Sequence, residues 1–209
     1  MGRFLVALLV VGLVGCQNQT QAVSSPAPSP TPHTAPTTAI LQSSDAPAGL
    51  NVCLGSGPID VYLSVLEIAD PTLAARDADQ WHAMRLQGAK DGAISVFTSD
   101  PSGCKAELGA SGNVKAVTSF VAQFDDEGEA DRAWQAGVFG FPPPPPGESA
   151  PGLIRGTDTG LGASSFTYDR PSVRLASWRR SVFVALVVVT NLDVASFRAA
   201  TGAVDPRLN

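Results

Sequence analysis

The chain has 209 residues and a net charge of −5, and charged side chains make up only 16% of it. This charged fraction is below the roughly 25% of ordinary soluble domains, and no basic excess of the kind that binds nucleic acid is present. The two histidines, His33 and His82, leave little scope for histidine-based metal sites or catalytic networks. We therefore expect no cofactor, no metal ion and no nucleic-acid partner.

The first residues have the pattern of a bacterial export signal. One positive charge, Arg3, precedes an apolar run over residues 4–14, which is too short to span a membrane. The run ends in Leu-Val-Gly-Cys, which resembles the lipobox of bacterial lipoproteins, where the cysteine carries the lipid. We predict a signal peptide over residues 1–15 and a lipidated Cys16, with the protein anchored on the extracytoplasmic face of the cell membrane. The alternative is an ordinary secretory signal with a chance cysteine.

The segment after Cys16 has the composition of a tether. Residues 17–44 contain no charged side chain, and 15 of these 28 residues are Ser, Thr or Pro. Such a segment buries too little apolar area to offset the entropy lost on ordering. The sequence therefore predicts a disordered tether over residues 16–47, followed by a single folded domain over residues 48–209.

Two cysteines remain within the predicted domain, Cys53 and Cys104. An even number of cysteines in an exported domain is typical of disulfide bonding. Metal binding is the alternative, but the sequence offers no second cysteine pair and no nearby histidine to complete a ligand set. We predict a disulfide between Cys53 and Cys104.

Helices are expected in four places along the domain. Apolar residues at helical spacing predict a helix over residues 59–69 that Asp70-Pro71 stops, and a second short helix from Asp77 to Gly88. Asp126 and Glu129 form a capping pair for a third helix, whose buried stripe includes Ala130, Ala133 and Trp134. Asn191 or Asp193 caps a final helix that Gly202 ends.

The strand candidates have alternating or continuous apolar patterns. The last of them is apolar on both faces and is expected to be the central strand. The five candidates are residues 93–98, 117–124, 164–168, 173–178 and 182–190. Short turns between neighbouring strands imply antiparallel pairing. The fold class we predict is α+β: an antiparallel sheet of four or five strands with helices packed mainly on one face.

The least ordinary segment of the domain is the proline-rich stretch over residues 138–151. It contains five consecutive prolines, Pro142 to Pro146, with Phe139 and Phe141 at its entrance. A run of prolines is already ordered as polyproline II and loses little entropy on binding, and aromatic rings add apolar contact area. We predict that Phe139, Phe141, Pro142 and Pro146 form the rim of a binding surface. The alternative is a rigid connector whose phenylalanines cap the core.

Two charged groups are weaker site candidates. Arg179 and Arg180 are candidate contacts for an anionic ligand or for the acidic cluster at residues 125–131, and the alternative is a solvated hairpin tip. The acidic cluster has five carboxylates, which suit either calcium binding or a helix N-terminus, and the helix explanation is favoured.

Catalytic patterns are sparse in the domain. A carboxylate pair from Asp60, Glu67 and Asp70 would suit glycoside hydrolysis, but helix surfaces are commonly charged. His82 stands on a predicted helix, and no nucleophile elbow accompanies it. We therefore assign no catalytic residue.

The second half of the domain resembles secreted lipoproteins of high-GC bacteria with sensor-like or uncharacterised extracytoplasmic domains. The resemblance rests on SFVAQFDDEGEADRAW, GLGASSFTYDR, ASWRRSVFVALVVVTNLD and GAVDPRL, within residues 118–208. It implies an exported α+β binding or sensing module and carries no catalytic residues.

From the sequence we expect a membrane-anchored, non-enzymatic lipoprotein that binds a small apolar ligand, an envelope component or a protein partner. The alternatives are a secreted hydrolase and a structural accessory lipoprotein without a ligand.

Overall fold

The computed structural model describes residues 34–209. The predicted signal peptide, the lipidation site Cys16 and the tether up to His33 lie outside the described residues. Within residues 34–209, no helix has the length and apolar character needed to cross a bilayer.

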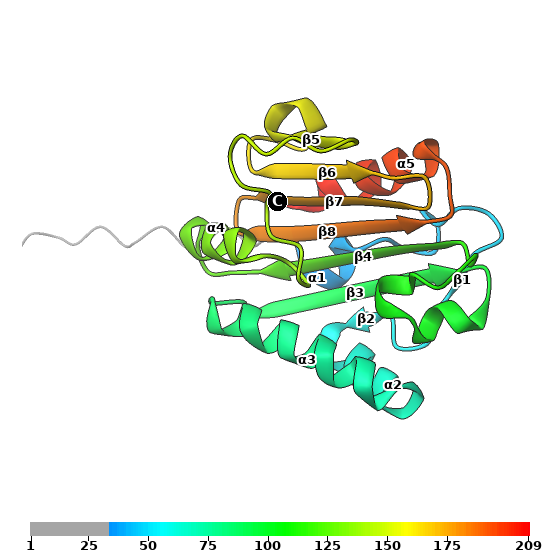
Figure 1. The fold of residues 1–209 in the computed structure, drawn as a ribbon. Helices are drawn as coiled ribbons and strands as arrows, with labels where there is room; N and C mark the ends of the chain where they lie inside the picture. Colours follow the sequence, from blue (N-terminus) through cyan, green and yellow to red (C-terminus); the bar gives the residue numbers. More distant parts are fainter. Residues whose placement is uncertain (1–33) are drawn as a thin grey trace, which may run out of the picture. The chain divides into compact units, whose positions relative to one another are not determined.

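The domain is α+β, as predicted, and is built on one antiparallel sheet (Figure 1). The strand order is β1-β3-β4-β8-β7-β6-β5, with β2 paired to the part of β3 that β1 leaves free. The strands are β1 (Asn51–Val52), β2 (Gly57–Pro58), β3 (Asp91–Thr98), β4 (Ala116–Gln123), β5 (Leu153–Arg155), β6 (Ser165–Asp169), β7 (Val173–Arg180) and β8 (Phe183–Thr190).

The sheet therefore has eight strands rather than the four or five expected. All five predicted strands are present, and β8 occupies the centre between β4 and β7, as its continuous apolar run indicated. The additional strands, β1, β2 and β5, have two or three residues each. Segments this short are below the length at which an alternating pattern is recognisable. They form only because longer neighbouring strands offer them unpaired backbone groups.

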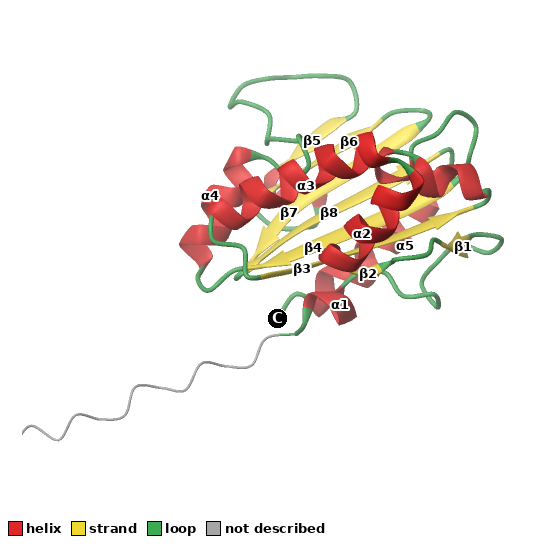
Figure 2. Ribbon diagram, turned by 90° about the horizontal axis from the view of Figure 1, so that it is seen from below, coloured by secondary structure: helices red, strands yellow, loops and turns green. Residues whose placement is uncertain are grey.

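The helices cover both faces of the sheet, whereas the prediction placed them mainly on one face (Figures 1 and 2). One face packs against α2, α3 and α4, and the other packs against α1 and α5. The α-helices are α1 (Pro36–Ala39), α2 (Ile59–Ala69), α3 (Pro71–Leu86), α4 (Glu127–Ala136) and α5 (Val194–Val204), and short 3₁₀ helices are η1 (Pro101–Lys105), η2 (Glu107–Gly109), η3 (Gly156–Thr159) and η4 (Asp205–Arg207).

Alternation along β4 shows how the sequence supplies two cores. Val117 and Val121 belong to the core beneath α1 and α5, whereas Phe120 and Ala122 belong to the core beneath α2, α3 and α4. Adjacent residues of a strand point to opposite faces, so a strand that is apolar throughout needs cover on both sides.

The helix caps follow the sequence closely except at α3. Asp126 caps α4 by accepting a hydrogen bond from the Glu129 backbone N–H, as predicted, and Asp193 caps α5. Helix α3 begins at Pro71 and not at Asp77, because the Asp70 side chain accepts from the N–H groups of Thr72 and Leu73. Proline is favoured in the first turn of a helix, so Asp70-Pro71 ends one helix and starts the next.

The folded part of the chain begins earlier than expected. We assigned residues 16–47 to a tether, but the structure packs residues 34–47 against the domain. Leu41 is buried, and its backbone N–H donates to Ser119 Oγ at 2.8 Å. The Thr34 N–H donates to the carbonyl of Asn209, so this segment also meets the C-terminus.

Candidate functional site

The proline-rich segment forms a strap between α4 and the edge strand β5 (Figure 1). We call residues 138–152 the proline strap. It starts in a tight turn in which Phe139 and Gly140 have φ values of 47° and 78°, and Val138 pairs with Phe141 across the turn. A positive φ is strained for a bulky residue, so packing must hold Phe139 in this conformation.

Phe139 is a core residue and does not belong to the rim. Its side chain is buried and meets the Phe120 ring edge-on, with ring centroids 4.8 Å apart. This corrects the prediction for Phe139 and matches the alternative in which it caps the core. Phe141 differs, because 36% of the residue remains exposed.

Arg155, the last residue of β5, fastens the strap to the sheet. Its Nη1 donates to the carbonyls of Pro144 (2.9 Å) and Pro145 (2.6 Å), and its Nη2 donates to the carbonyl of Glu148 (2.9 Å). Proline carbonyls are accessible acceptors because polyproline II forms no internal hydrogen bonds. No motif marked Arg155 in the sequence, and its role depends on the strap folding back over β5.

Two hollows flank the strap and share Pro143, Pro144 and Phe166 in their walls. The Tyr168 hollow, of about 280 Å³, is bordered by Phe141, Tyr168 and the outer side of the strap. The Trp134 hollow, of about 390 Å³, lies between the strap, the end of α4 and the loop that precedes β6. Volumes of this order are typical of sites for small molecules.

The aromatic wall of these hollows comes from residues that the sequence analysis assigned to the core or to a strand. The rings of Trp134 and Phe166 have centroids 6.4 Å apart, and Phe166 meets Tyr168 edge-on at 6.0 Å. Strand alternation places Phe166 and Tyr168 on one face of β6, the face that α4 covers. Predicting this cluster would have required knowing that Trp134, near the end of α4, meets Phe166 of β6.

Buried indole N–H groups add a polar feature. The Nε1 atoms of Trp81, Trp134 and Trp178 have no hydrogen-bond partner among the described residues. Of the three rings, Trp134 is the one that lines either hollow beside the strap. Its Nε1 atom is itself closed to a water-sized probe, so it is the ring of Trp134 and not its N–H group that borders the hollow.

The arginine candidates are occupied by the protein's own carboxylates. Arg180 makes a two-pronged pair with Asp205, with Nε–Oδ1 and Nη2–Oδ2 distances of 2.8 and 2.7 Å. Arg179 lies 3.2 Å from Asp131 and 3.6 Å from Glu127, both in the acidic cluster. The sequence analysis had named the acidic cluster as one possible partner of Arg179. Both arginines are therefore already paired with carboxylates of the protein and are not free to bind an external anion.

The acidic cluster serves the start of α4. Asp126 caps the helix, and Asp125 pairs with Lys90 at 2.9 Å. Within residues 34–209, no group of three or more His, Cys, Asp or Glu side chains is arranged to hold a metal ion.

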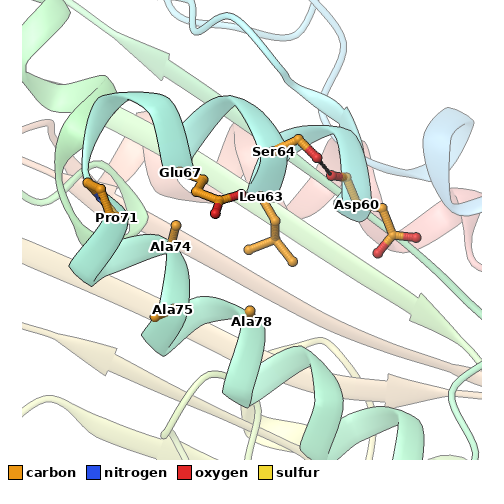
Figure 3. Close-up of a pocket in the computed structure, with 8 residues that line it drawn as sticks. All are labelled: Asp60, Leu63, Ser64, Glu67, Pro71, Ala74, Ala75 and Ala78. Carbon is orange, nitrogen blue, oxygen red and sulfur yellow. Dashed lines mark hydrogen bonds between the residues drawn. The ribbon is translucent and has the colours of Figure 1, made fainter.

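A third hollow, of about 370 Å³, lies between α2 and α3 and contains two of the candidate hydrolytic carboxylates (Figure 3). Asp60 and Glu67 both line it, but they are two helical turns apart, about 10 Å along the axis. The wall opposite them is Pro71 and three alanines, which present no side-chain acid or base. The remaining candidate, Asp70, is used as the cap of α3. His82 lies exposed on α3, away from this hollow.

The predicted disulfide is present and joins Cys53 to Cys104. It borders a smaller apolar hollow of about 250 Å³ beside α2, where Leu54 is 83% exposed. The described residues thus offer aromatic and apolar walls for binding in more than one place.

The chain matches no protein-family model, no curated protein sequence and no solved structure.

Proposed function

We propose that this protein is an extracytoplasmic lipoprotein, anchored in the cell membrane through Cys16, whose α+β domain is a non-enzymatic binding or sensing module. The observation that carries the proposal is the proline strap with an aromatic-walled hollow on each side. Its binding surface consists of Phe141, the exposed side of Pro142–Pro146 and the ring of Tyr168, with the buried ring of Phe166 beneath them.

The strap has the properties of a preorganised binding element. Arg155 fixes its backbone at three carbonyls, so little conformational freedom is left to lose when a ligand binds. Rings and prolines provide apolar contact area at low entropic cost. The ligand that suits these walls is a small, largely apolar molecule.

Export is supported independently by the cysteines. Disulfides persist in oxidising compartments outside the cytoplasm, and the Cys53–Cys104 bond accounts for both cysteines of the described residues. Lipid attachment at Cys16 then explains why the remaining cysteine stands at the end of the apolar signal. The resemblance to secreted lipoproteins of high-GC bacteria points the same way.

Anchoring is tested by Cys16→Ser. We expect the wild-type protein to fractionate with membranes and to carry lipid, as read by mass spectrometry of the intact protein. The variant should lose the lipid mass, because a serine hydroxyl does not accept the thioether-linked diacylglycerol. A lipid mass that persists in the variant, or that is absent from the wild type, would contradict the anchor.

Ligand binding at the strap is tested by native mass spectrometry of the protein extracted from membranes. We expect a small molecule to co-purify at one copy per chain and to be lost in Phe141→Ser. Ile154→Ser is the matched control, because Ile154 is a similarly exposed apolar residue on β5 that lines neither hollow. Equal retention by both variants would place binding elsewhere, and no bound molecule in any preparation would contradict a ligand-binding role.

A further inference from the structure

Exposed aliphatic side chains gather on the outer side of α2. Within residues 34–209, Ile68 and Leu54 are the two most exposed large apolar residues, at 88% and 83%. Val61, Val65 and Ile68 follow one another at spacings of four and three residues, so they form one stripe along the helix. The apolar hollow beside α2 continues this stripe, because Leu54, Val65 and Ala69 line it. We call Leu54, Val61, Val65 and Ile68 the α2 stripe.

The α2 stripe is preformed by close packing of the loop that carries Leu54. A Cβ atom added at Gly55 would lie 2.9 Å from the Cβ of Val65, so the backbone of this loop lies directly against the helix. The disulfide at Cys53 fastens the same loop to η1. Leu54 is therefore held beside the helix and cannot fold away from solvent.

Folding of the domain does not account for this stripe. A surface helix needs one apolar face, and α2 already buries such a face in the core with Ile59, Tyr62 and Leu66. The α2 stripe is a second apolar face that no described residue covers. Contiguous exposed apolar surface of this kind marks a contact with a membrane or another macromolecule.

The start of the described chain indicates which of these contacts applies. Thr34 stands just before α1, and α1 and α2 both contact β2 at the β3 edge of the sheet (Figure 2). Only the 17 residues 17–33 separate Cys16 from Thr34, and they span at most about 60 Å. Lipid attached at Cys16 would thus keep this edge of the domain near the bilayer, at a high effective concentration of lipid.

We infer that the α2 stripe docks on the bilayer that carries the lipid anchor, with Leu54, Val61 and Ile68 reaching into the headgroup region and the upper acyl chains. Apolar helix faces bind in this interface without spanning the membrane. The inference rests on the proposed anchor at Cys16, and it gives the protein a second contact with the same membrane.

Charge and topology define this contact further. The charged side chains of α2 are Asp60 and Glu67, which anionic lipid would repel, so the stripe suits headgroups without net charge. The strand order places β5, and the proline strap beside it, at the opposite edge of the sheet from β3. Docking through α2 therefore leaves the strap open to ligands from outside the cell.

The test supplies the anchor chemically. Cys16 is the one cysteine outside the disulfide, so the mature chain over residues 16–209 is coupled through it to a maleimide lipid in phosphatidylcholine vesicles. The reporter is Ile68→Trp, and the quencher is phosphatidylcholine brominated on its acyl chains, which quenches tryptophan on contact. The three native tryptophans are at most 6% exposed and give a constant background. We expect brominated vesicles to quench the emission of Ile68→Trp but not that of the wild type.

Matched variants separate docking from mere attachment. Ile154→Trp places the same reporter at an exposed isoleucine of β5, and we expect no quenching there. Adding Leu54→Ser and Val61→Ser to Ile68→Trp should lower the docking equilibrium constant by about tenfold or more. Leu86→Ser, an equally exposed change at the end of α3, should leave the quenching of Ile68→Trp intact. Equal urea midpoints would show that the serine variants remain folded.

Equal quenching of the two tryptophan reporters would overturn the inference, as would quenching that survives Leu54→Ser with Val61→Ser. A second copy of the chain is the competing occupant of the stripe. It would give a dimer of the unanchored chain in sedimentation, broken by the two serines, with no quenching of Ile68→Trp, and this result also overturns the inference. Because the vesicles impose the anchor, failure of docking leaves the proposed function standing. Failure of the natural anchor would appear in the Cys16→Ser experiment instead.

Discussion

Asp77 shows at the scale of one residue how a buried charge ties stability to pH. It lies on the inner face of α3, 1% exposed, and its Oδ2 has no hydrogen-bond partner among residues 34–209. Burial, reinforced by the nearby charge of Glu107, raises the pKa of Asp77 from 3.8 to about 6. The ionised form is therefore disfavoured in the folded state relative to the unfolded chain.

The sign of the pH dependence follows from proton binding. Well below pH 4, Asp77 is protonated in both the folded and the unfolded state, so its ionisation does not affect stability. Between about pH 4 and 6 the unfolded chain releases the proton first, so stability falls as pH rises, by about 3 kcal/mol in total for a pKa shift of about 2 units. The loss persists at higher pH.

We therefore expect Asp77→Asn to stabilise the domain above pH 6, by about 1–3 kcal/mol. Urea unfolding measured from pH 4 to pH 8 should show that the free energy of unfolding of the variant, relative to that of the wild type, increases between about pH 4 and pH 6. Asp79→Asn, an exposed change on the same helix, is the control and should keep the wild-type pH profile. A constant difference between Asp77→Asn and wild type at every pH would show that Asp77 does not titrate as described.

At the scale of an element, the segment over residues 34–47 is held by the end of the chain. Arg207 forms a two-pronged pair with Asp45, at 2.8 and 3.0 Å, and also donates to the carbonyl of Ile40. The hydrogen bond from Arg207 holds the pKa of Asp45 below its usual value, against the opposing effect of burial. A depressed carboxyl pKa stabilises the fold above the unfolded pKa, and the contribution is lost as pH falls through the folded pKa.

Arg207→Gln is expected to lower stability by about 1–3 kcal/mol at pH 7, because it leaves the partly buried Asp45 without its partner. The difference from wild type should shrink as the pH falls through the lowered pKa of Asp45, where its carboxylate becomes protonated. Arg198→Gln is the control, since Arg198 is exposed on α5 and takes part in no ion pair within the described part of the chain. Limited proteolysis should show faster cleavage within residues 34–47 in Arg207→Gln but not in Arg198→Gln. Equal protection of this segment in both variants would show that Arg207 does not hold it against the domain.

At the scale of the whole molecule, the two-sided cover of the sheet contributes to the low charge of the sequence, together with the N-terminal 44 residues, in which Arg3 is the one charged side chain. Strands β3, β4 and β8 are buried along nearly their whole length, so apolar residues fill both alternating sets of positions. The disulfide ties the segment before α2 to η1, beyond the end of β3. In the chain-entropy account, closing a loop of about 50 residues contributes on the order of 4 kcal/mol.

The sequence by itself determined the α+β class, the five long strands, the caps of α4 and α5 and the pairing of Cys53 with Cys104. These features depend on local periodicity, on side chains that bond to a neighbouring backbone, and on a count of cysteines. Each signal lies within a few residues or in the composition, so it can be recognised before the chain is folded.

The tertiary structure alone decided which residues face the hollows and which segments complete the sheet. Residues 34–47 have a tether's composition and yet pack, because Arg207 and Ser119 bind them from distant parts of the chain. Phe139 lies in the core and Phe141 lies on the surface, although both stand at the entrance to the prolines. Arg155 acquires its role only when the strap folds back across β5. Contacts between residues far apart in sequence depend on the packing of whole elements, which local pattern does not encode.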